Sequence, residues 1–404
     1  MKKFLAILLS AIMVVGLLAG CGNSAPAANN STPAASDPAP ANTQPENTSN
    51  ETPAEAAPSA KGYKIGALDM TATGASSFLV TDKTIRDLCA TVGAEYVPVS
   101  LAGYDDASFI AAYENMIDLG CDAVIVYTFS EGPISLVADM MEEANVSWFL
   151  ANRRISDDAL REKVFSMKSF IGNCYCEEEE NAHDMVVELS QNMGVKNLAV
   201  IGLTQGDLNG DLRDKGIARA CEECGVNLLT ETRGISTVDD VTNAVEGIIA
   251  SYPEVDGIFI VGGAVTNGAL AGASQALANH GLSDKVTIAM VDIATGMSAY
   301  MGDGQALKLV TGGNLVMDNV LASSCIINHA MGVNVESEPY IINTHMMHVY
   351  TAQDADDYDA YCENPNLPVL SGDQWFDTLV GKSVEEIAAF AADFSIEYAK
   401  SLHS

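Results

Sequence analysis

The sequence predicts an α/β protein made of two lobes, each built around a doubly wound parallel sheet. Three observations lead to this prediction. Short, continuous apolar runs alternate with segments of helical periodicity, as expected for parallel strands that helices cover on both faces. The alternation occurs in the first half of the chain and again in the second. Beyond a polar N-terminal stretch, about 340 residues remain, which is too long for one ordinary hydrophobic core.

Strands and helices follow one another through the first half. A run rich in β-forming residues begins it, and later apolar runs each follow a segment with helical spacing. We expect strands at Tyr63–Leu68, Tyr96–Val99, Asp122–Tyr127 and Val146–Ala151, and helices that end at Val92 and span Ala107–Leu119 and Ile134–Ala144. Crossovers between parallel strands should be right-handed.

The second half repeats the alternation. We expect strands at Leu198–Leu203, Leu228–Glu231, Gly257–Val261 and Val286–Val291, with helices at Leu212–Cys224 and Val238–Ser251. A short internal echo links the two halves, because the run that begins at Cys121 (CDAVIVY) matches the run that begins at Val255 (VDGIFIV). Both follow a helix and precede a loop of small residues, which favours a duplication.

Residues 1–20 have the features of a lipoprotein signal peptide. Lys2 and Lys3 precede the apolar run Phe4–Ala19, which is too short and too near the N-terminus for a membrane span. The Leu-Ala-Gly-Cys sequence that ends at Cys21 resembles the lipobox of bacterial lipoproteins, in which the cysteine thiol carries a diacylglycerol. The alternative is an ordinary signal peptide with a cysteine near its cleavage site. We expect the protein to be anchored by lipid on Cys21 at the extracytoplasmic face of the cell membrane.

Residues 21–60 are expected to form a disordered linker behind the lipidated cysteine. They are almost entirely Ala, Pro, Asn, Ser, Thr, Gln and Glu and include no aromatic residue. Such a segment cannot bury enough apolar surface to offset its chain entropy. The folded body therefore begins near Lys61.

The charge balance excludes one class of partner. The chain carries 54 acidic and 20 basic residues, a formal net charge of −34. A body this acidic repels nucleic acid and anionic headgroups, so we expect no nucleic-acid partner and no membrane contact except through the lipid. Solubility is the simplest interpretation of the charge.

The cysteines and histidines do not predict a metal site. Cys121 and Cys325 lie in apolar segments and should be buried, while the pairing of Cys174, Cys176, Cys221 and Cys224 stays open in an exported chain. Cys221 and Cys224 have C-x-x-C spacing, but no second ligand pair lies nearby. The sequence from His345 to His348 has the alternation of a strand. We expect neither a metal nor a cofactor.

Sequence signatures of the main enzyme classes are missing. The chain has no G-x-x-x-x-G-K-[ST] phosphate loop, no G-x-G-x-x-G after its first strand and no G-x-S-x-G elbow. Its six histidines have no evident acid or nucleophile partner. We therefore expect a protein that is not an enzyme, in preference to a dinucleotide-binding oxidoreductase of the same fold class.

Several segments together resemble the type 1 periplasmic binding proteins, the ribose- and galactose-binding group. The resemblance covers nearly all of Lys61–Tyr350 and is carried by GCDAVIV, ANVSWFLANRR, LRDKGIARA, YPEVDGIFIVGG and VTIAMVD. It implies two lobes, joined by three hinge crossings, that close on a ligand. The crossings would lie near Phe170–Asn173, Gly313–Met317 and Asn343–Met347. Lobe 1 would then comprise residues 61–171 plus 315–345, and lobe 2 residues 172–314 plus 346–404 with a C-terminal extension.

The resemblance also implies a function. It predicts a monomeric substrate-binding lipoprotein of an ABC transporter, which delivers a small polar ligand, above all a sugar, to a membrane permease. Two alternatives stay open. The protein could be a ligand-sensing receptor, or its ligand could be a nucleoside or an autoinducer-like molecule.

Candidate ligand-binding residues stand at the carboxyl ends of the expected strands, where open parallel sheets bind ligands. Amide, carboxylate and guanidinium groups suit sugar hydroxyls, and aromatic faces suit sugar C–H surfaces. The resemblance implies that Asn152 and Arg153 grip ring hydroxyls, helped by Arg213 and Asp292. The remaining candidates are Tyr127 and Phe129 at a strand end, Asn314 at the second crossing and Phe78 as a stacking aromatic.

Each candidate has a structural alternative. Tyr127 and Phe129 could pack beneath the cleft, Phe78 could belong to the core and Arg213 could lie on a solvated helix face. Where sugar binders usually carry Asn-Asp after the sixth strand, this chain has Gly262 and Gly263. The missing amide leaves room for a bulkier or less hydroxylated ligand than ribose.

Overall fold

The computed structural model of the protein describes residues 59–235, 237–262, 266–333 and 338–403. The expected signal peptide, the lipidated Cys21, nearly all of the expected linker and Gly263 lie outside these ranges. Within them, none of the helices combines the length and the apolar character that crossing a bilayer would require.

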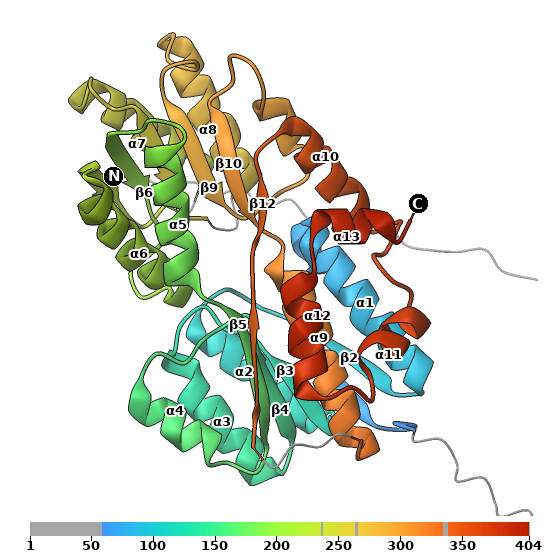
Figure 1. Cartoon of the computed structure of the whole chain (residues 1–404). Coiled ribbons are helices and arrows are strands. Elements are labelled where there is room, and N and C mark those ends of the chain that lie inside the picture. Colours follow the sequence, from blue (N-terminus) through green and yellow to red (C-terminus); the bar gives the residue numbers. More distant parts are fainter. Residues whose placement is uncertain (1–58, 236, 263–265, 334–337, 404) are drawn as a thin grey trace, which may run out of the picture. The chain divides into compact units, whose positions relative to one another are not determined.

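The first sheet holds six strands in the order β11–β5–β4–β3–β1–β2, all parallel (Figure 1). Its strands are β1 (Lys64–Asp69), β2 (Glu95–Ser100), β3 (Ala123–Val126), β4 (Ser147–Ala151), β5 (Phe170–Cys176) and β11 (Tyr340–Thr344). The second sheet has the order β12–β10–β9–β8–β6–β7, and only β12 pairs antiparallel. Its strands are β6 (Asn197–Ile201), β7 (Asn227–Thr232), β8 (Gly257–Ile260), β9 (Thr287–Val291), β10 (Leu307–Gly312) and β12 (Met347–Val349).

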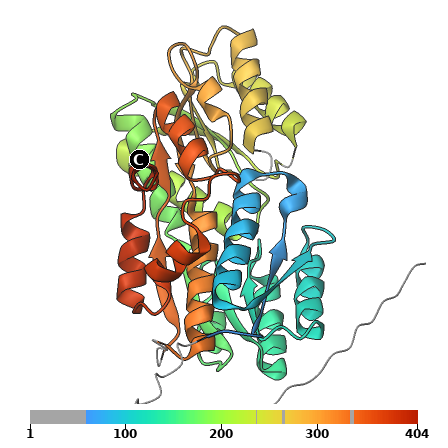
Figure 2. The ribbon, with the colours of Figure 1, turned by 90° about the vertical axis from the view of Figure 1, so that its right-hand side faces the viewer.

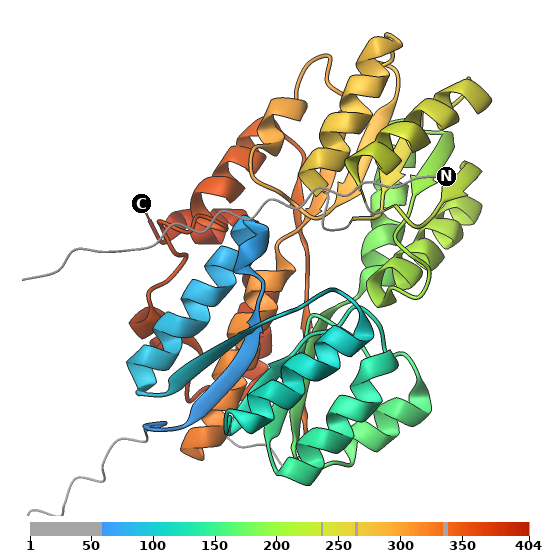
Figure 3. The same ribbon diagram turned by 180° about the vertical axis from the view of Figure 1, so that it is seen from behind.

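Helices cover both faces of the first sheet, because residues alternate along each strand. Val124 and Val126 of β3 belong to a core cluster with α2 (Asp106–Asp118) and α3 (Gly132–Ala144). Ala123 and Ile125 face the opposite side, with α1 (Ser76–Val92) and α9 (Asn314–Met331). Figure 3 shows α1 and the pair α2 and α3 as separate layers.

The second sheet is covered in the same way. Phe259 and Val261 pack with the helices α5 (Glu178–Gln191) and α6 (Leu208–Cys224), while Ile258 and Ile260 pack with α7 (Val238–Ser251) and α8 (Thr266–Asn279). The short α4 (Asp158–Phe165) lies on the first lobe, and the 3-10 turns η1 (Thr71–Thr73) and η2 (Met297–Tyr300) follow β1 and β9. The expected two-lobed α/β fold is confirmed.

The chain passes between the sheets three times in the described ranges. It leaves the first sheet after β5, returns between β10 and α9 at Gly313, and crosses again between β11 and β12. The first crossing was expected near Phe170–Asn173, but these residues lie inside β5. That strand continues to Cys176 because it is paired on both edges, with β4 and β11.

The C-terminal extension contacts both lobes. Its helices are α10 (Ala352–Tyr361), α11 (Gly372–Leu379), α12 (Val384–Asp393) and α13 (Ile396–Ser401). The first of these contacts η2 and β12 of the second lobe, whereas α11 contacts α1 and α9 of the first, and α12 contacts β11 (Figure 2). A Cβ on Gly372 would lie 2.5 Å from the Asp87 carbonyl oxygen, which shows how closely α11 approaches α1. Residues 372–393 therefore pack on lobe 1, although we expected residues 346–404 to accompany lobe 2.

Individual side chains follow the expected burial. Trp148 is fully buried, and Cys121 and Cys325 are buried as expected for small apolar residues. The alternation around His345 and His348 corresponds to β11 and β12, which run from Tyr340 to Val349 with a short break at residues 345–346.

Candidate functional site

Asn152 and Asp292 occupy equivalent positions in the two lobes. Asn152 directly follows β4 and Asp292 directly follows β9, and each strand is the fourth of its lobe along the chain. Both residues have left-handed backbone angles, with φ of 61° and 77°. Among residues other than glycine in the described ranges, only Asn145, at a helix end, shares this conformation. Such conformations are costly and tend to occur where a side chain must be aimed at a site.

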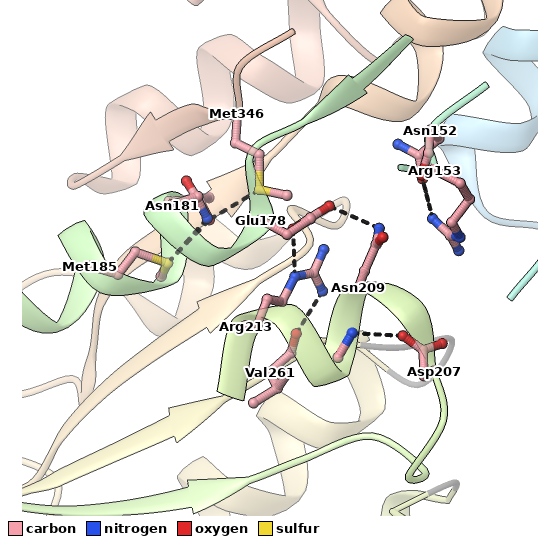
Figure 4. A network of polar contacts seen from close by, with 12 residues as sticks. Asn152, Arg153, Glu178, Asn181, Met185, Asp207, Asn209, Arg213, Val261 and Met346 are labelled. Carbon is pink, nitrogen blue, oxygen red and sulfur yellow. Dashed lines mark hydrogen bonds and ion pairs between the residues drawn. The ribbon is translucent and has the colours of Figure 1, made fainter. Parts of the chain in front are cut away.

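Arg153 is held by four hydrogen bonds to its own lobe. Its Nη1 donates to the carbonyl oxygen and to Oδ1 of Asn152, at 2.7 and 2.6 Å (Figure 4). Its Nη2 donates to the Tyr127 hydroxyl at 3.0 Å. Its Nε donates to the Thr128 carbonyl oxygen. A guanidinium has five N–H groups, so one N–H of Nη2 is left without a partner among the described residues.

Two aromatic rings lie beside this guanidinium. The Arg153 Cζ lies 4.5 Å from the ring centre of Tyr127 and 5.8 Å from that of Phe129, and the two rings meet edge to face. The hydroxyl of the buried Tyr113 fixes the end of β3 by donating to the Tyr127 carbonyl oxygen and accepting from the Tyr127 N–H. The first lobe therefore presents the charged Arg153 guanidinium, an N–H donor, against the rings of Tyr127 and Phe129.

A buried ion pair forms the corresponding cluster of the second lobe. The Nε of Arg213 donates to Glu178 Oε2 at 2.7 Å, and Asn209 Nδ2 donates to Oε1 of the same carboxylate at 2.8 Å (Figure 4). The Nη1 of Arg213 donates to the Val261 carbonyl oxygen at the end of β8. Burial alone would lower the pKa of Arg213, but the charges of Glu178 and Asp292 outweigh it and raise that pKa. Arg213 thus remains charged, and its Nη2 has no partner in the described part of the chain.

Gly262 lets two polar side chains approach the end of β8. A Cβ built on this glycine would lie 2.8 Å from both Arg213 Nη1 and Asp292 Oδ2. Its φ of 116° also disfavours any side chain. The glycine leaves room, as the sequence suggested, but that room is occupied by the approaching guanidinium and carboxylate.

The charged groups of the second-lobe cluster act on a hydroxyl of the first-lobe cluster. Burial raises the pKa of the Tyr127 hydroxyl, Arg153 opposes this, and the second-lobe carboxylates Asp207 and Asp292 add to the rise. The N–H of Leu208, the first residue of α6, donates to the Phe129 carbonyl oxygen across the lobes at 3.0 Å. The strand ends of both lobes therefore contribute to one polar site.

The side chain of Asp318, on α9, contacts the first-lobe cluster. This fully buried carboxylate of α9 accepts from Asn152 Nδ2 at 3.0 Å through Oδ2, while its Oδ1 has no hydrogen-bond partner in the described ranges. Burial raises its pKa to about 7, opposed by the hydrogen bond from Asn152 and by the nearby Thr344 hydroxyl. Among the described residues the Thr344 hydroxyl has no hydrogen-bond partner, so its contact with the Asp318 carboxylate falls outside normal hydrogen-bond geometry.

Two of the candidate residues have no hydrogen bond or ring contact with these clusters among the described residues. Phe78, on the first turn of α1, is partly buried and belongs to none of the core clusters of the described chain. Asn314 begins α9 and is 8% exposed. The described hydrogen bonds and ring contacts include none between either side chain and the polar clusters.

Several site residues were not identified from the sequence. Asn209 lies one helical turn before Arg213, so the helical period could have indicated it. Asp318 is the lone carboxylate of an apolar helix, and a buried carboxylate often marks a site. Glu178 is hidden in the acidic run 177–180, which sequence alone cannot separate from a solvated face.

The arrangement is suited to binding. The strand ends of the two lobes carry guanidinium donors, a carboxylate acceptor, an amide and aromatic rings, groups that can bind a polar ligand. Within the described ranges, no group of three or more His, Cys, Asp and Glu side chains could hold a metal ion, and the eight cysteines there are free thiols.

Comparison with known proteins bears on this arrangement. A family model described as the periplasmic binding protein domain matches residues 67–313, more than half of the chain. None of the curated proteins compared with the chain matches it.

Solved structures share the fold at low sequence identity. A periplasmic ribose ABC transporter protein from Conexibacter woesei is 15% identical with a TM-score of 0.63, covering 76% of this chain and 100% of its own. A periplasmic solute-binding protein from Actinobacillus succinogenes with bound D-allose is 16% identical with a TM-score of 0.62, at 74% and 100% coverage. A solute-binding protein from Bacillus halodurans with bound myo-inositol is 17% identical with a TM-score of 0.59, at 76% and 99% coverage. With the family match and the two-lobed fold, the chain belongs to the periplasmic binding protein family.

Proposed function

We propose that this protein is a lipid-anchored, extracytoplasmic solute-binding protein that delivers a small polar ligand, above all a sugar, to an ABC permease. The observation that supports this most is the pair of polar clusters at the strand ends, with Arg153 in lobe 1 and with Arg213 and Asp292 in lobe 2. The two guanidinium groups offer N–H donors beyond those used within the protein, and a carboxylate has several acceptor positions. Two neighbouring hydroxyls of the ligand could therefore be bound together, one accepting from a guanidinium N–H and the other donating to the carboxylate.

The charge of the site favours an uncharged ligand. The carboxylates of Glu178, Asp207 and Asp292 carry at least as much negative charge as Arg153 and Arg213 carry positive charge. An anionic solute would therefore meet no net positive charge. The rings of Tyr127 and Phe129 offer faces to C–H groups. The solved neighbours include a ribose ABC transporter protein and proteins with bound D-allose and myo-inositol, all of them uncharged polyhydroxylated molecules.

Binding would work by population shift between open and closed lobes. Because the ligand touches groups of both lobes, only the closed form makes all contacts, and the ligand stabilises that form. The closed lobes would then dock on the permease, whose separate ATPase supplies energy. Cys21 would carry the lipid, and the linker up to residue 60 would hold the body off the membrane.

Thermal-shift screening of the protein against ribose, allose, arabinose, galactose, myo-inositol, nucleosides and amino acids tests the proposal. A ligand present at 100 times its dissociation constant should add about 2.7 kcal/mol of stability. A shift with sugars alone supports the sugar assignment. A shift with nucleosides alone would replace it, and no shift with any of these compounds would contradict it.

A further inference from the structure

The C-terminal extension places a buried carboxylate beside the proposed ligand site. Glu363 follows α10 and is 5% exposed, although it belongs to an acidic protein in which most carboxylates face solvent. The extension has no part in either sheet, and its helices contact both lobes.

Glu363 ends a chain of hydroxyl groups that connects the lobes. Its Oε2 accepts from Ser76 Oγ at 2.8 Å, and its Oε1 accepts from the Tyr358 hydroxyl at 2.5 Å. Ser76 Oγ in turn accepts from Thr295 Oγ1 at 2.9 Å. Ser76 is the first residue of α1 in lobe 1, whereas Thr295 lies in the loop after β9 in lobe 2.

These two hydroxyls belong to the segments that carry proposed site residues. Phe78 lies two residues after Ser76 on α1, and Asp292 lies three residues before Thr295. The neighbouring Asp359 of α10 also accepts the Gly296 N–H at 2.8 Å. The extension therefore fixes the start of α1 and the loop after Asp292 at the same time.

We propose that Glu363 is a positioning residue for ligand binding, which aligns the start of α1 with the loop after Asp292 through Ser76 and Thr295. The inference rests on the proposed function for its ligand, but its geometric part can be tested without any ligand. The carboxylate form is the active one, because a hydrogen bond to an ionised acceptor is roughly twice as strong as a neutral one.

The titration of Glu363 supplies a readout that simple packing would not. Burial raises its pKa to about 7, Tyr358 and Ser76 oppose the rise, and the charges of Asp359 and Asp292 add to it. The alignment should therefore weaken as the pH falls from 8 to 6 and the carboxyl becomes neutral. Glutamine at this position is neutral throughout and should remove this pH dependence.

Hydrogen exchange on the full-length, ligand-free protein tests the alignment. The amides to follow are Gly296, which donates to Asp359, and Leu79, which closes the first turn of α1. At pH 8, Glu363→Gln should speed the exchange of both amides, corrected for intrinsic rates, about tenfold. Ser76→Ala should do the same while Glu363 is intact. The matched control is Asp357→Asn on α10, because that partly buried carboxylate pairs, among the described residues, with Lys400 and Gln353 and should leave both amides unchanged.

Calorimetric titration with ribose, allose, arabinose, galactose and myo-inositol gives the second readout. Between pH 8 and pH 6 the wild-type protein should lose about tenfold more sugar affinity than Glu363→Gln, because Asp318, whose pKa is also raised to about 7, titrates in both proteins. Unchanged exchange in both variants, or a sugar affinity of Glu363→Gln that equals the wild type at pH 8, would overturn the inference. A wild type that binds none of the sugars would count against the proposed function alone, and the exchange result would still decide the role of Glu363.

Discussion

Replacing Asp318 with asparagine should stabilise the protein at alkaline pH, although the side chain lies at the centre of a polar cluster. Asp318 is fully buried, accepts one hydrogen bond from Asn152, and leaves its second oxygen unpaired. Its pKa is raised from 3.8 to about 7, first by burial and also by the charge of Glu178, against opposing contributions from Asn152, Thr344 and Arg153. The protein therefore favours the neutral acid, which asparagine imitates.

The sign and size of the effect follow from this pKa. Between about pH 4 and pH 7 the unfolded chain releases the proton of Asp318 while the folded chain keeps it, so stability falls as the pH rises through this window. The difference between a pKa of 3.8 in the unfolded chain and one of about 7 in the folded protein corresponds to about 4 kcal/mol of stability, all of it lost by roughly pH 8. The amide that Asp318→Asn introduces cannot ionise, can still accept from Asn152, and can offer an N–H to the unpaired Thr344 hydroxyl.

Denaturant unfolding of both proteins at pH 5 and pH 8 measures the difference. The free energy of unfolding of Asp318→Asn should exceed that of the wild type by a few kcal/mol at pH 8, and the gap should be much smaller at pH 5. The refuting result is a variant that is less stable than the wild type at pH 8. The ionised carboxylate would then be an important stabilising partner for Arg153 or Asn152.

Three further predictions concern the strand ends and the anchor. Gly262→Ala should lower stability by about 1–3 kcal/mol in denaturant unfolding, because its φ of 116° suits glycine and its Cβ would contact Arg213 and Asp292; wild-type stability would contradict the described backbone. Tyr113→Phe should cost about 1–3 kcal/mol in the same assay, because the N–H and carbonyl of Tyr127 lose their partner, and a neutral result would mean that other groups bind them. Cys21→Ala should abolish lipid labelling and either release the protein or leave it as an uncleaved precursor, whereas a variant that stays lipidated and membrane-bound would disprove the anchor at this residue.

Much of the fold could be predicted from the sequence because strand burial follows composition. The expected strands Asp122–Tyr127 and Val146–Ala151 correspond to β3 and β4, which are covered on both faces and so are continuously apolar. The C-terminal helices were harder to place. Trp375 and Leu379 of α11 are buried against helices that lie far away in the chain, and no local pattern states which lobe receives them.

The site was predicted in part for a similar reason. Asn152, Arg153 and Asp292 could be found because they directly follow apolar strands, and topology brings strand ends together. Glu363 could not be found, because its partner Ser76 is 287 positions away and the contact exists only after both lobes and the extension have folded. Glu178 was missed because its pairing with Arg213 distinguishes it from its acidic neighbours only in three dimensions.

Ligand titration of Asp292→Asn tests most directly the claim that a polar solute binds at the strand ends of both lobes. Asparagine tolerates the left-handed backbone of this position and removes the charge, whereas changing Arg153 would also disturb Tyr127 and Thr128. Calorimetry with the sugar found by screening should show affinity roughly tenfold to a hundredfold weaker than in the wild type. Asp303→Asn, which alters an exposed aspartate of the same lobe, should bind like the wild type. Equal affinities in all three proteins would contradict the account and place the ligand elsewhere.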